Sequence, residues 1–261
     1  MLLQLLSGAV VGVSLGLTGG GGSILAVPLL LHVVGMDLRA AVKASLAVVG
    51  LTSLLGAWMQ RSEVVWRAGL VLGVGGIAGA PLGAFLGGYF PDQWVLILFS
   101  GLMLFIAYRF WKGAGATEVP IYRFSCRREP GETSPPFRVA CAAKLGLAGV
   151  AAGVLAGLFG VGGGFLLVPA LVVIAGLPLG KALATSLPGI ALLSGAGFYA
   201  NWAISDPIAF ETVTIFLAGA LGGMVLGTHL KPKIPAEVLK KIFAVMITTI
   251  AVAMVWKSFS A

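Results

Sequence analysis

The chain has 261 residues, of which 59% are hydrophobic and only 10% are charged, and its mean hydropathy is +1.04. That composition excludes a soluble globular protein, because several stretches of about twenty nearly uncharged residues match the length needed to cross a bilayer. The formal net charge of +8 would suggest nucleic-acid binding in a soluble protein. Here the basic residues lie in loops between apolar segments, where they indicate membrane topology. We therefore expect an all-α polytopic membrane protein with no nucleic-acid partner.

The first apolar stretch covers residues 2–34 and is too long for one span. As a single helix it would measure about 50 Å, against a hydrocarbon core of about 30 Å. The glycine run Gly19–Gly22 interrupts it, with Thr18 before the run and Ser23 after it. We therefore expect two short helical pieces that form a hairpin, which either re-enters the membrane or crosses it twice.

The remaining segments alternate between apolar spans and polar connections. Residues 112–138 hold four prolines and several charged residues, so they indicate a polar, basic linker that does not span the membrane. A second interrupted stretch covers residues 139–175, with its glycine run at residues 160–164. Full spans are predicted at residues 40–59, 68–89, 94–111, 181–202, 207–230 and 238–256.

The two halves of the chain repeat each other in sequence. Pairs of identical residues at an offset of 141 include Gly8/Gly149, Gly12/Gly153, Pro28/Pro169, Ser45/Ser186 and Ser53/Ser194. In the later segments the offset is 144, as in Gly75/Gly219, Gly79/Gly223 and Gly83/Gly227. The pattern predicts a first repeat at residues 1–111, the linker at 112–138, and a second repeat at 139–261.

The lysines and arginines predict how the repeats are oriented. If each interrupted segment enters and leaves the membrane on the same side, the two repeats are inverted. With the linker inside, all but three of the 17 basic residues then lie inside, the exceptions being Arg39, Lys43 and Lys257. If each interrupted segment crossed once, Lys181 and the basic residues of 231–241 would move outside. The rule therefore favours inverted repeats, each a glycine-broken helical hairpin plus three transmembrane helices.

Duplicated interruptions in membrane helices indicate a binding site, because lipid does not tolerate open backbone. A helix that restarts after glycines presents unpaired N–H groups and a partial positive charge, and glycine lets a ligand approach them. Two such starts facing each other would form a concave site for an anion near the midplane. The alternative is that the glycines serve only a kink and tight packing. The candidate substrate-binding residues of the two runs are Thr18, Gly19, Gly20, Gly21, Gly22, Ser23, Gly160, Val161, Gly162, Gly163 and Gly164.

Polar residues in the segments after the interruptions extend the predicted site. Ser45, Thr185 and Ser186 are further candidate substrate-binding residues. Ser53 and Ser194 also fall on inner parts of these segments. Serines in membrane helices more often bond their own backbone or a neighbour than a substrate, so a structural role is the alternative for each.

Lys43 and Lys181 are single cations near the mouths of the two halves. Each could draw anions into a vestibule, although reaching outward to the lipid interface is the more frequent role of such lysines. Acidic side chains are absent from the middle of the spans, with Glu211 near a helix start as the nearest exception. The sequence therefore predicts no catalytic residues, no metal site and no cofactor, and it argues against an enzyme.

The glycine pattern over Gly8–Pro28, which returns over Gly149–Pro169, resembles that of the TauE/SafE sulfite exporter family. The dipeptide Thr185-Ser186 adds to the likeness, which covers essentially the whole chain. The resemblance implies a multi-pass permease of a bacterial or archaeal inner membrane, and the positive-inside rule predicts that its basic middle loop is cytoplasmic. It also implies a small anionic substrate such as sulfite, a sulfonate, sulfoacetate or a related organosulfur compound.

These patterns together predict a secondary transporter that works by alternating access of one half against the other. Its partners would be the lipid bilayer, a small sulfur-containing anion, and H⁺ or Na⁺ as a candidate coupling ion. The alternative is an anion channel that uses the same site without alternation.

Overall fold

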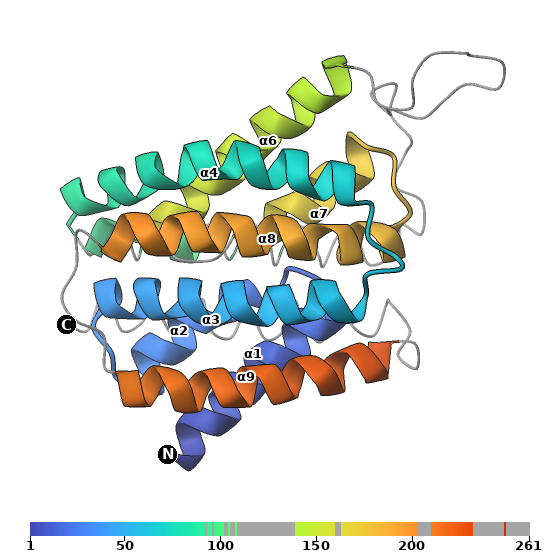
Figure 1. Ribbon diagram of the computed structural model, residues 1–261. Coiled ribbons are helices and arrows are strands. Elements are labelled where there is room, and N and C mark those ends of the chain that lie inside the picture. Colours follow the sequence, from blue (N-terminus) through green and yellow to red (C-terminus); the bar gives the residue numbers. More distant parts are fainter. Residues whose placement is uncertain are drawn as a thin grey trace, which may run out of the picture.

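The computed structural model describes residues 1–91, 93–95, 97–101, 104, 108, 139–159, 163–202, 210–231 and 248, and its elements are α-helices (Figure 1). Among these residues five helices, α3, α4, α6, α8 and α9, are long and apolar enough to cross a membrane. The prediction of an all-α polytopic membrane protein is therefore confirmed.

The first half begins with a short helical hairpin. Helix α1, Leu2–Thr18, ends where Gly19 adopts a positive φ of 68° and donates its N–H to the Leu15 carbonyl at 2.8 Å. A side chain would strain this left-handed cap, which explains the glycine. Gly22 then packs against the backbone of Leu15, so that helix α2, Ser23–His32, returns along α1.

Two long helices follow the hairpin and complete the described first half. Helix α3 covers Leu38–Met59 and helix α4 covers Trp66–Tyr89, within two residues of the predicted spans. Half of the predicted span 94–111 lies outside the described residues, and the linker 112–138 lies wholly outside them.

The second half repeats this order. Helix α6, Val139–Phe159, and helix α7, Gly164–Val173, flank the second interruption, and Gly163 has a positive φ of 64° before α7. Helices α8, Leu179–Trp202, and α9, Phe210–Leu230, follow. Apart from residue 248, the predicted span 238–256 lies outside the described residues, so the division into residues 1–111, 112–138 and 139–261 stays a prediction.

The two halves of the chain are interleaved through glycine-lined helix pairs. Helix α1 packs on α9 and helix α4 packs on α6. Gly8 and Gly12 of α1 lie against the backbone of Phe216 and Ala220, so these helices run in the same direction. Such close approach is what small residues allow where lipid gives no hydrophobic drive for association. The corresponding contacts of α4 on α6 are Gly149 with Leu72, Gly153 with Gly76, and Gly157 with Ala80.

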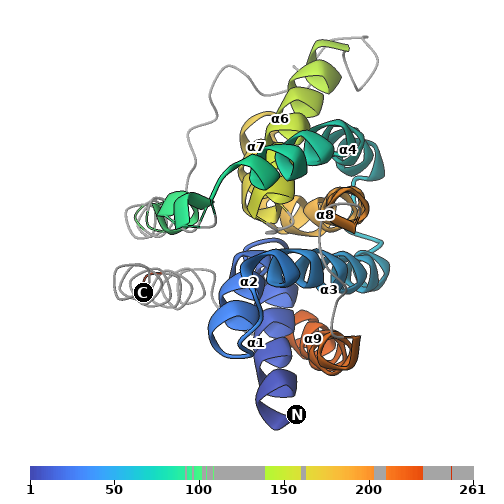
Figure 2. The same ribbon diagram turned by 90° about the vertical axis from the view of Figure 1, so that its left-hand side faces the viewer.

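Helices α3 and α8 cross the middle of the bundle side by side and run in opposite directions. Gly197 of α8 contacts Leu46, whereas Gly50, one turn later on α3, contacts Ser194. The four long helices α4, α8, α3 and α9 form one layer, and the two hairpins lie behind it with α6 and α7 beside α4 and α8 (Figures 1 and 2).

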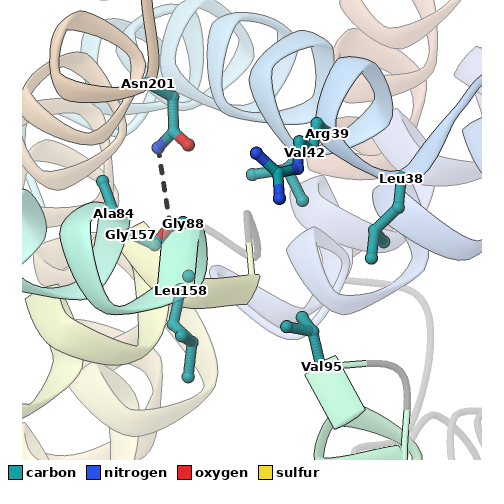
Figure 3. A pocket seen from close by; sticks show the side chains of 10 residues that line it. Leu38, Arg39, Val42, Ala84, Gly88, Val95, Gly157, Leu158 and Asn201 are labelled. Carbon is teal, nitrogen blue, oxygen red and sulfur yellow. Dashed lines mark hydrogen bonds between the residues drawn. The ribbon is translucent and has the colours of Figure 1, made fainter. Parts of the chain in front are cut away.

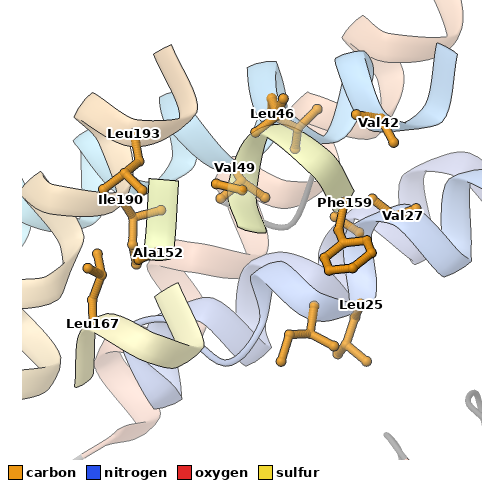
Figure 4. Close-up of a cluster of buried hydrophobic side chains, with 14 of the residues drawn as sticks. Leu25, Val27, Val42, Leu46, Val49, Ala152, Phe159, Leu167, Ile190 and Leu193 are labelled. Carbon is orange, nitrogen blue, oxygen red and sulfur yellow. The ribbon is translucent and has the colours of Figure 1, made fainter. Parts of the chain in front are cut away.

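The apolar core lies between the two hairpins and the central pair α3 and α8. Figure 4 shows side chains of α2, α3, α6, α7 and α8 gathered there. Leu25, Leu46, Leu167 and Ile190 are fully or almost fully buried in this cluster. The core therefore fixes the hairpins against α3 and α8 and sets the position of the interruptions.

Candidate functional site

The two interruptions meet inside the bundle. A Cβ atom built on Gly20 would lie 2.6 Å from the Gly164 carbonyl oxygen, and one built on Gly164 would lie 2.7 Å from the Gly20 carbonyl oxygen. Both residues are buried. The structure therefore brings together the described parts of the two predicted glycine sites, Gly19–Gly22 and Gly163–Gly164, whereas Gly160, Val161 and Gly162 lie outside the described residues.

Backbone N–H groups of the first interruption and of the start of α2 lie next to this contact. The N–H groups of Ser23, Ile24 and Leu25 bond the carbonyls three residues earlier, at 3.4, 3.3 and 3.1 Å. Among the described residues no hydrogen bond is found for the N–H groups of Gly20 and Gly21. Because the first turn of a helix carries a partial positive charge, this backbone can interact with an anion.

Two serines brace the first interruption. Ser23 donates its hydroxyl to the Gly20 carbonyl at 2.7 Å. Ser186, on α8 of the other half, shares its one hydroxyl proton between the Gly19 carbonyl at 2.8 Å and the Leu183 carbonyl at 2.8 Å. Both serines are fully buried. Their protons are used by carbonyls, so their first effect is to hold the glycine turn in shape.

The other predicted hydroxyl residues also bond backbone. Thr18 donates to the Ser14 carbonyl at 2.7 Å, and Ser45 donates to the Val42 carbonyl at 3.0 Å. Thr185 accepts the N–H of Val65 at 3.0 Å, which fixes the start of α4 against α8. These contacts fit the structural role that serines and threonines commonly have in membrane helices.

Two buried serines have hydroxyls without a hydrogen-bond partner among the described residues. Ser53 of α3 and Ser194 of α8 are fully buried, and neither Oγ atom is bonded. They are equivalent positions at the offset of 141, and Ser194 lies against Gly50 in the α3–α8 seam. An unpaired buried hydroxyl is costly, so these two are available donors that the predicted site left out. The signal in the sequence that could have identified them is that both repeats have serine at this position.

A small cleft opens at one end of the bundle (Figure 3). It is lined by Arg39 and Val42 of α3, Gly87 of α4, Gly157 and Leu158 of α6, and Asn201 of α8. The Asn201 amide donates to the Gly157 carbonyl at 3.4 Å and to the Gly197 carbonyl at 2.8 Å. The cleft has a volume of about 30 Å³, which is room for about two water molecules.

The two predicted vestibule lysines differ in their surroundings. Lys43 is 2% exposed, and its Nζ lies 5.2 Å from the centre of the Trp202 ring. Its side chain is therefore covered by protein, whereas reaching outward to the interface is the more frequent role of such lysines. A cation over an aromatic face is stabilised by the ring quadrupole. Lys181, at the start of α8, is exposed.

An apolar bundle in which two interrupted helices meet at the centre defines a class of protein, the multi-pass membrane transporter. The family described as "Sulfite exporter TauE/SafE" matches residues 4–254. The chain belongs to this family, and the resemblance seen in the glycine pattern is confirmed.

Relatives extend over almost the whole chain. A "Probable membrane transporter protein" of Xylella fastidiosa (strain Temecula1 / ATCC 700964) is 30% identical, over 100% of this chain and 97% of its own length. The "Probable membrane transporter protein YunE" of Bacillus subtilis (strain 168) is 27% identical, over 96% of this chain and 95% of its own length. No solved structure matches the chain.

Proposed function

We propose that the protein is a secondary transporter that carries small sulfur-containing anions, such as sulfite or a sulfonate, across the cell's inner membrane. The substrate would bind where the two interruptions meet, held by backbone N–H groups beside Gly20 and Gly164, in a turn that Ser23 and Ser186 keep in shape. The reciprocal contact of these two glycines is the observation that carries the proposal. The substrate class rests on the family's name and on the positive ends of the helices.

The proposed architecture is a pair of inverted repeats, divided at residues 1–111 and 139–261 around the linker 112–138. The helix directions support it: α3 and α8 are equivalent helices and run in opposite directions. The hairpin form of α1 and α2 also fits, because a segment that enters and leaves on one side inverts the next half. Alternating access would then move one half against the other around the central site.

The distribution of basic residues supports a cytoplasmic linker. The α3 C-terminus and the α4, α6 and α8 N-termini lie at one end of the bundle (Figure 1). That end carries most of the described cations. These are Arg61, Arg67, Lys144, Lys181 and Lys231. The opposite end carries Arg39 and Lys43, so the positive-inside rule assigns the first end to the cytoplasm.

The test is anion flux in proteoliposomes that contain the purified chain. We expect wild type to move [³⁵S]sulfite or a labelled sulfonate, and Gly20→Leu and Gly164→Leu to lose that flux because the side chain fills the contact. Gly195→Leu is the matched control, since nothing lies within 4 Å of a Cβ at that position. Normal flux by folded Gly20→Leu and Gly164→Leu proteins would remove this site from the mechanism.

An anion channel with the same site is the second candidate. The observation that favours a channel is the small cleft at one end of the bundle. A channel would pass anions down their electrochemical gradient without coupling to H⁺ or Na⁺. Uphill sulfite accumulation driven by an imposed H⁺ or Na⁺ gradient would therefore decide for the transporter.

A further inference from the structure

Three residues that line the Asn201 cleft have equivalents in the other repeat, and these equivalents lie at the opposite end of the bundle. The residue types differ between the two ends. Asn201 corresponds to Gln60 at the offset of 141. Gly87 and Ala84, which line the cleft, correspond to Lys231 and Thr228 at the offset of 144. Two small residues of one end are thus replaced by a cation and a hydroxyl at the other.

Lys231 and Gln60 are in direct contact at this end. The Lys231 ammonium donates to Gln60 Oε1 at 2.6 Å, and the pair joins the ends of α9 and α3. Because lysine only donates, the contact fixes the amide oxygen toward Lys231 and leaves Gln60 Nε2 on the other side. Asn201 differs, since its amide nitrogen is bonded to Gly157 and Gly197.

Two buried donors at this end of the bundle have no partner among the described residues. Gln60 is 7% exposed, and its Nε2 atom is buried and unbonded. Thr228 Oγ1 is likewise buried and unbonded. Thr228 lies one turn before Lys231 on α9, and residues three apart share a helix face. Met224, one turn earlier again, contacts Gly56 of α3, so this face of α9 follows α3 up to Gln60.

We propose that Gln60, Thr228 and Lys231 form an oxyanion-binding subsite at this end of the bundle. The ligand would accept from the Lys231 ammonium, the Gln60 amide and the Thr228 hydroxyl. The proposal rests on the proposed function, within which this subsite holds the anion at one mouth of the pathway. A bound oxyanion would satisfy the two unpaired donors and neutralise a cation that is half-buried.

The chemistry of the three groups selects an oxyanion over a cation or an apolar ligand. The Lys231 ammonium and the Gln60 amide N–H only donate, and Gln60 Oε1 already accepts from Lys231. Burial lowers the pKa of Lys231, while Glu63 acts in the opposite direction. An anion bound at the subsite would favour the charged lysine and would restore that pKa toward its usual value.

The first experiment maps the reactivity of Lys231 in the intact chain. Purified protein is treated with an amine-reactive acylating reagent, and labelled peptides are quantified by mass spectrometry. Sulfate or methanesulfonate should lower the labelling of Lys231 about fivefold or more, whereas chloride at equal ionic strength should not. Lys144 of α6 is the internal control, because it is exposed, belongs to no proposed anion site and should label equally under all conditions.

Variants then separate an anion subsite from a purely structural contact. Gln60→Leu and Thr228→Val should remove the protection of Lys231 by sulfate, whereas Thr214→Val should retain it. Thr214 is an exposed threonine of the same helix, and its hydroxyl bonds the carbonyls of Phe210 and Glu211 in the preceding turn. Lys231→Met should weaken sulfate binding, measured by calorimetry, about tenfold or more, and Lys231→Arg should keep most of it.

Each outcome decides the proposal independently of the proposed function. Unchanged labelling of Lys231 with sulfate or methanesulfonate overturns the subsite, as does wild-type sulfate affinity in folded Gln60→Leu protein. If Gly20→Leu then still abolishes flux, the proposed function stands without the subsite. If Gly20→Leu transports normally while Gln60→Leu loses the protection, the subsite stands and the central glycine site fails.

Discussion

Gly20 and Gly164 pack against each other in the middle of the bundle, although 144 residues separate them in the chain. Each blocks the space that the other's Cβ would need, because each such atom would approach the partner's carbonyl oxygen to within 2.7 Å. Real Cβ atoms do not make contacts this short, and the obstacle is backbone, which cannot rotate away as a side chain can. Glycine at both positions is therefore a requirement of the meeting of the two interruptions.

Alanine at these two positions should destabilise the protein in a coupled way. We expect Gly20→Ala and Gly164→Ala each to cost about 1–3 kcal/mol, as overpacking generally does. The double variant should cost less than the sum, because the first side chain already separates the two turns. Reversible unfolding in detergent measures the three values, with Gly195→Ala as the control in open space. Additivity within about 0.5 kcal/mol would show that the two residues do not share a contact.

Neighbouring glycines of α9 should respond to alanine with opposite signs. A Cβ on Gly223 would overlap the Ala9 carbonyl of α1, whereas a Cβ on Gly222 meets nothing within 4 Å. Gly223→Ala should lower stability by about 1–3 kcal/mol, while Gly222→Ala should raise it by about 0.5–1 kcal/mol through its better helix propensity. Thermal unfolding of the two proteins in one detergent checks this. Equal shifts in both would contradict close packing of α1 on α9.

Hydropathy and glycine spacing predicted the helices and the two interruptions well. The spans at α3, α4 and α8 begin within two residues of their predicted starts, because the apolar length needed for a membrane is a local property. The left-handed backbone of Gly19 is also a local feature, because helices frequently end at a glycine in this conformation. These features depend on neighbours in sequence.

The partners of single polar side chains were not predictable in the same way. Ser186 bonds the Gly19 carbonyl, 167 residues away, and only the packing of α8 on the first hairpin determines this. Two roles were open for Lys43, a charge in a vestibule and a lysine that reaches the interface, and neither showed that it is buried and faces Trp202, a residue of the other half. A single sequence shows which residue types lie on a helix and does not show which helix covers them.

Stability should depend on pH through Lys231. Its pKa in the folded protein lies below the usual 10.5 because burial disfavours the charged form. Between the lowered pKa and 10.5 the unfolded chain binds more protons at this site, so unfolding free energy rises as pH increases through that window. The carboxylate of Glu63 opposes this shift in pKa, because a nearby negative charge favours the charged lysine.

The measurement is the difference between two proteins, so that other titrating groups cancel. Thermal unfolding of wild type and Lys231→Met is followed from neutral to alkaline pH in anion-free buffer. Wild type should gain stability relative to the variant as pH rises, and the two curves should level off relative to each other above 10.5. A difference that is flat across this range would mean that burial does not perturb Lys231.

Ser186 and Ser194 lie on the same helix, are both fully buried, and should nevertheless respond differently to alanine. Ser186→Ala removes the bond to the Gly19 carbonyl and should cost about 0.5–1.5 kcal/mol. Ser194→Ala removes an unpaired hydroxyl from an apolar seam, which should be neutral or slightly stabilising.

If Ser194 donates to a bound anion, the same substitution should also reduce the increase in Tm that sulfite gives to wild type. Thermal unfolding with and without sulfite measures both effects, and equal losses of Tm in anion-free buffer would show that Ser194 has a partner after all.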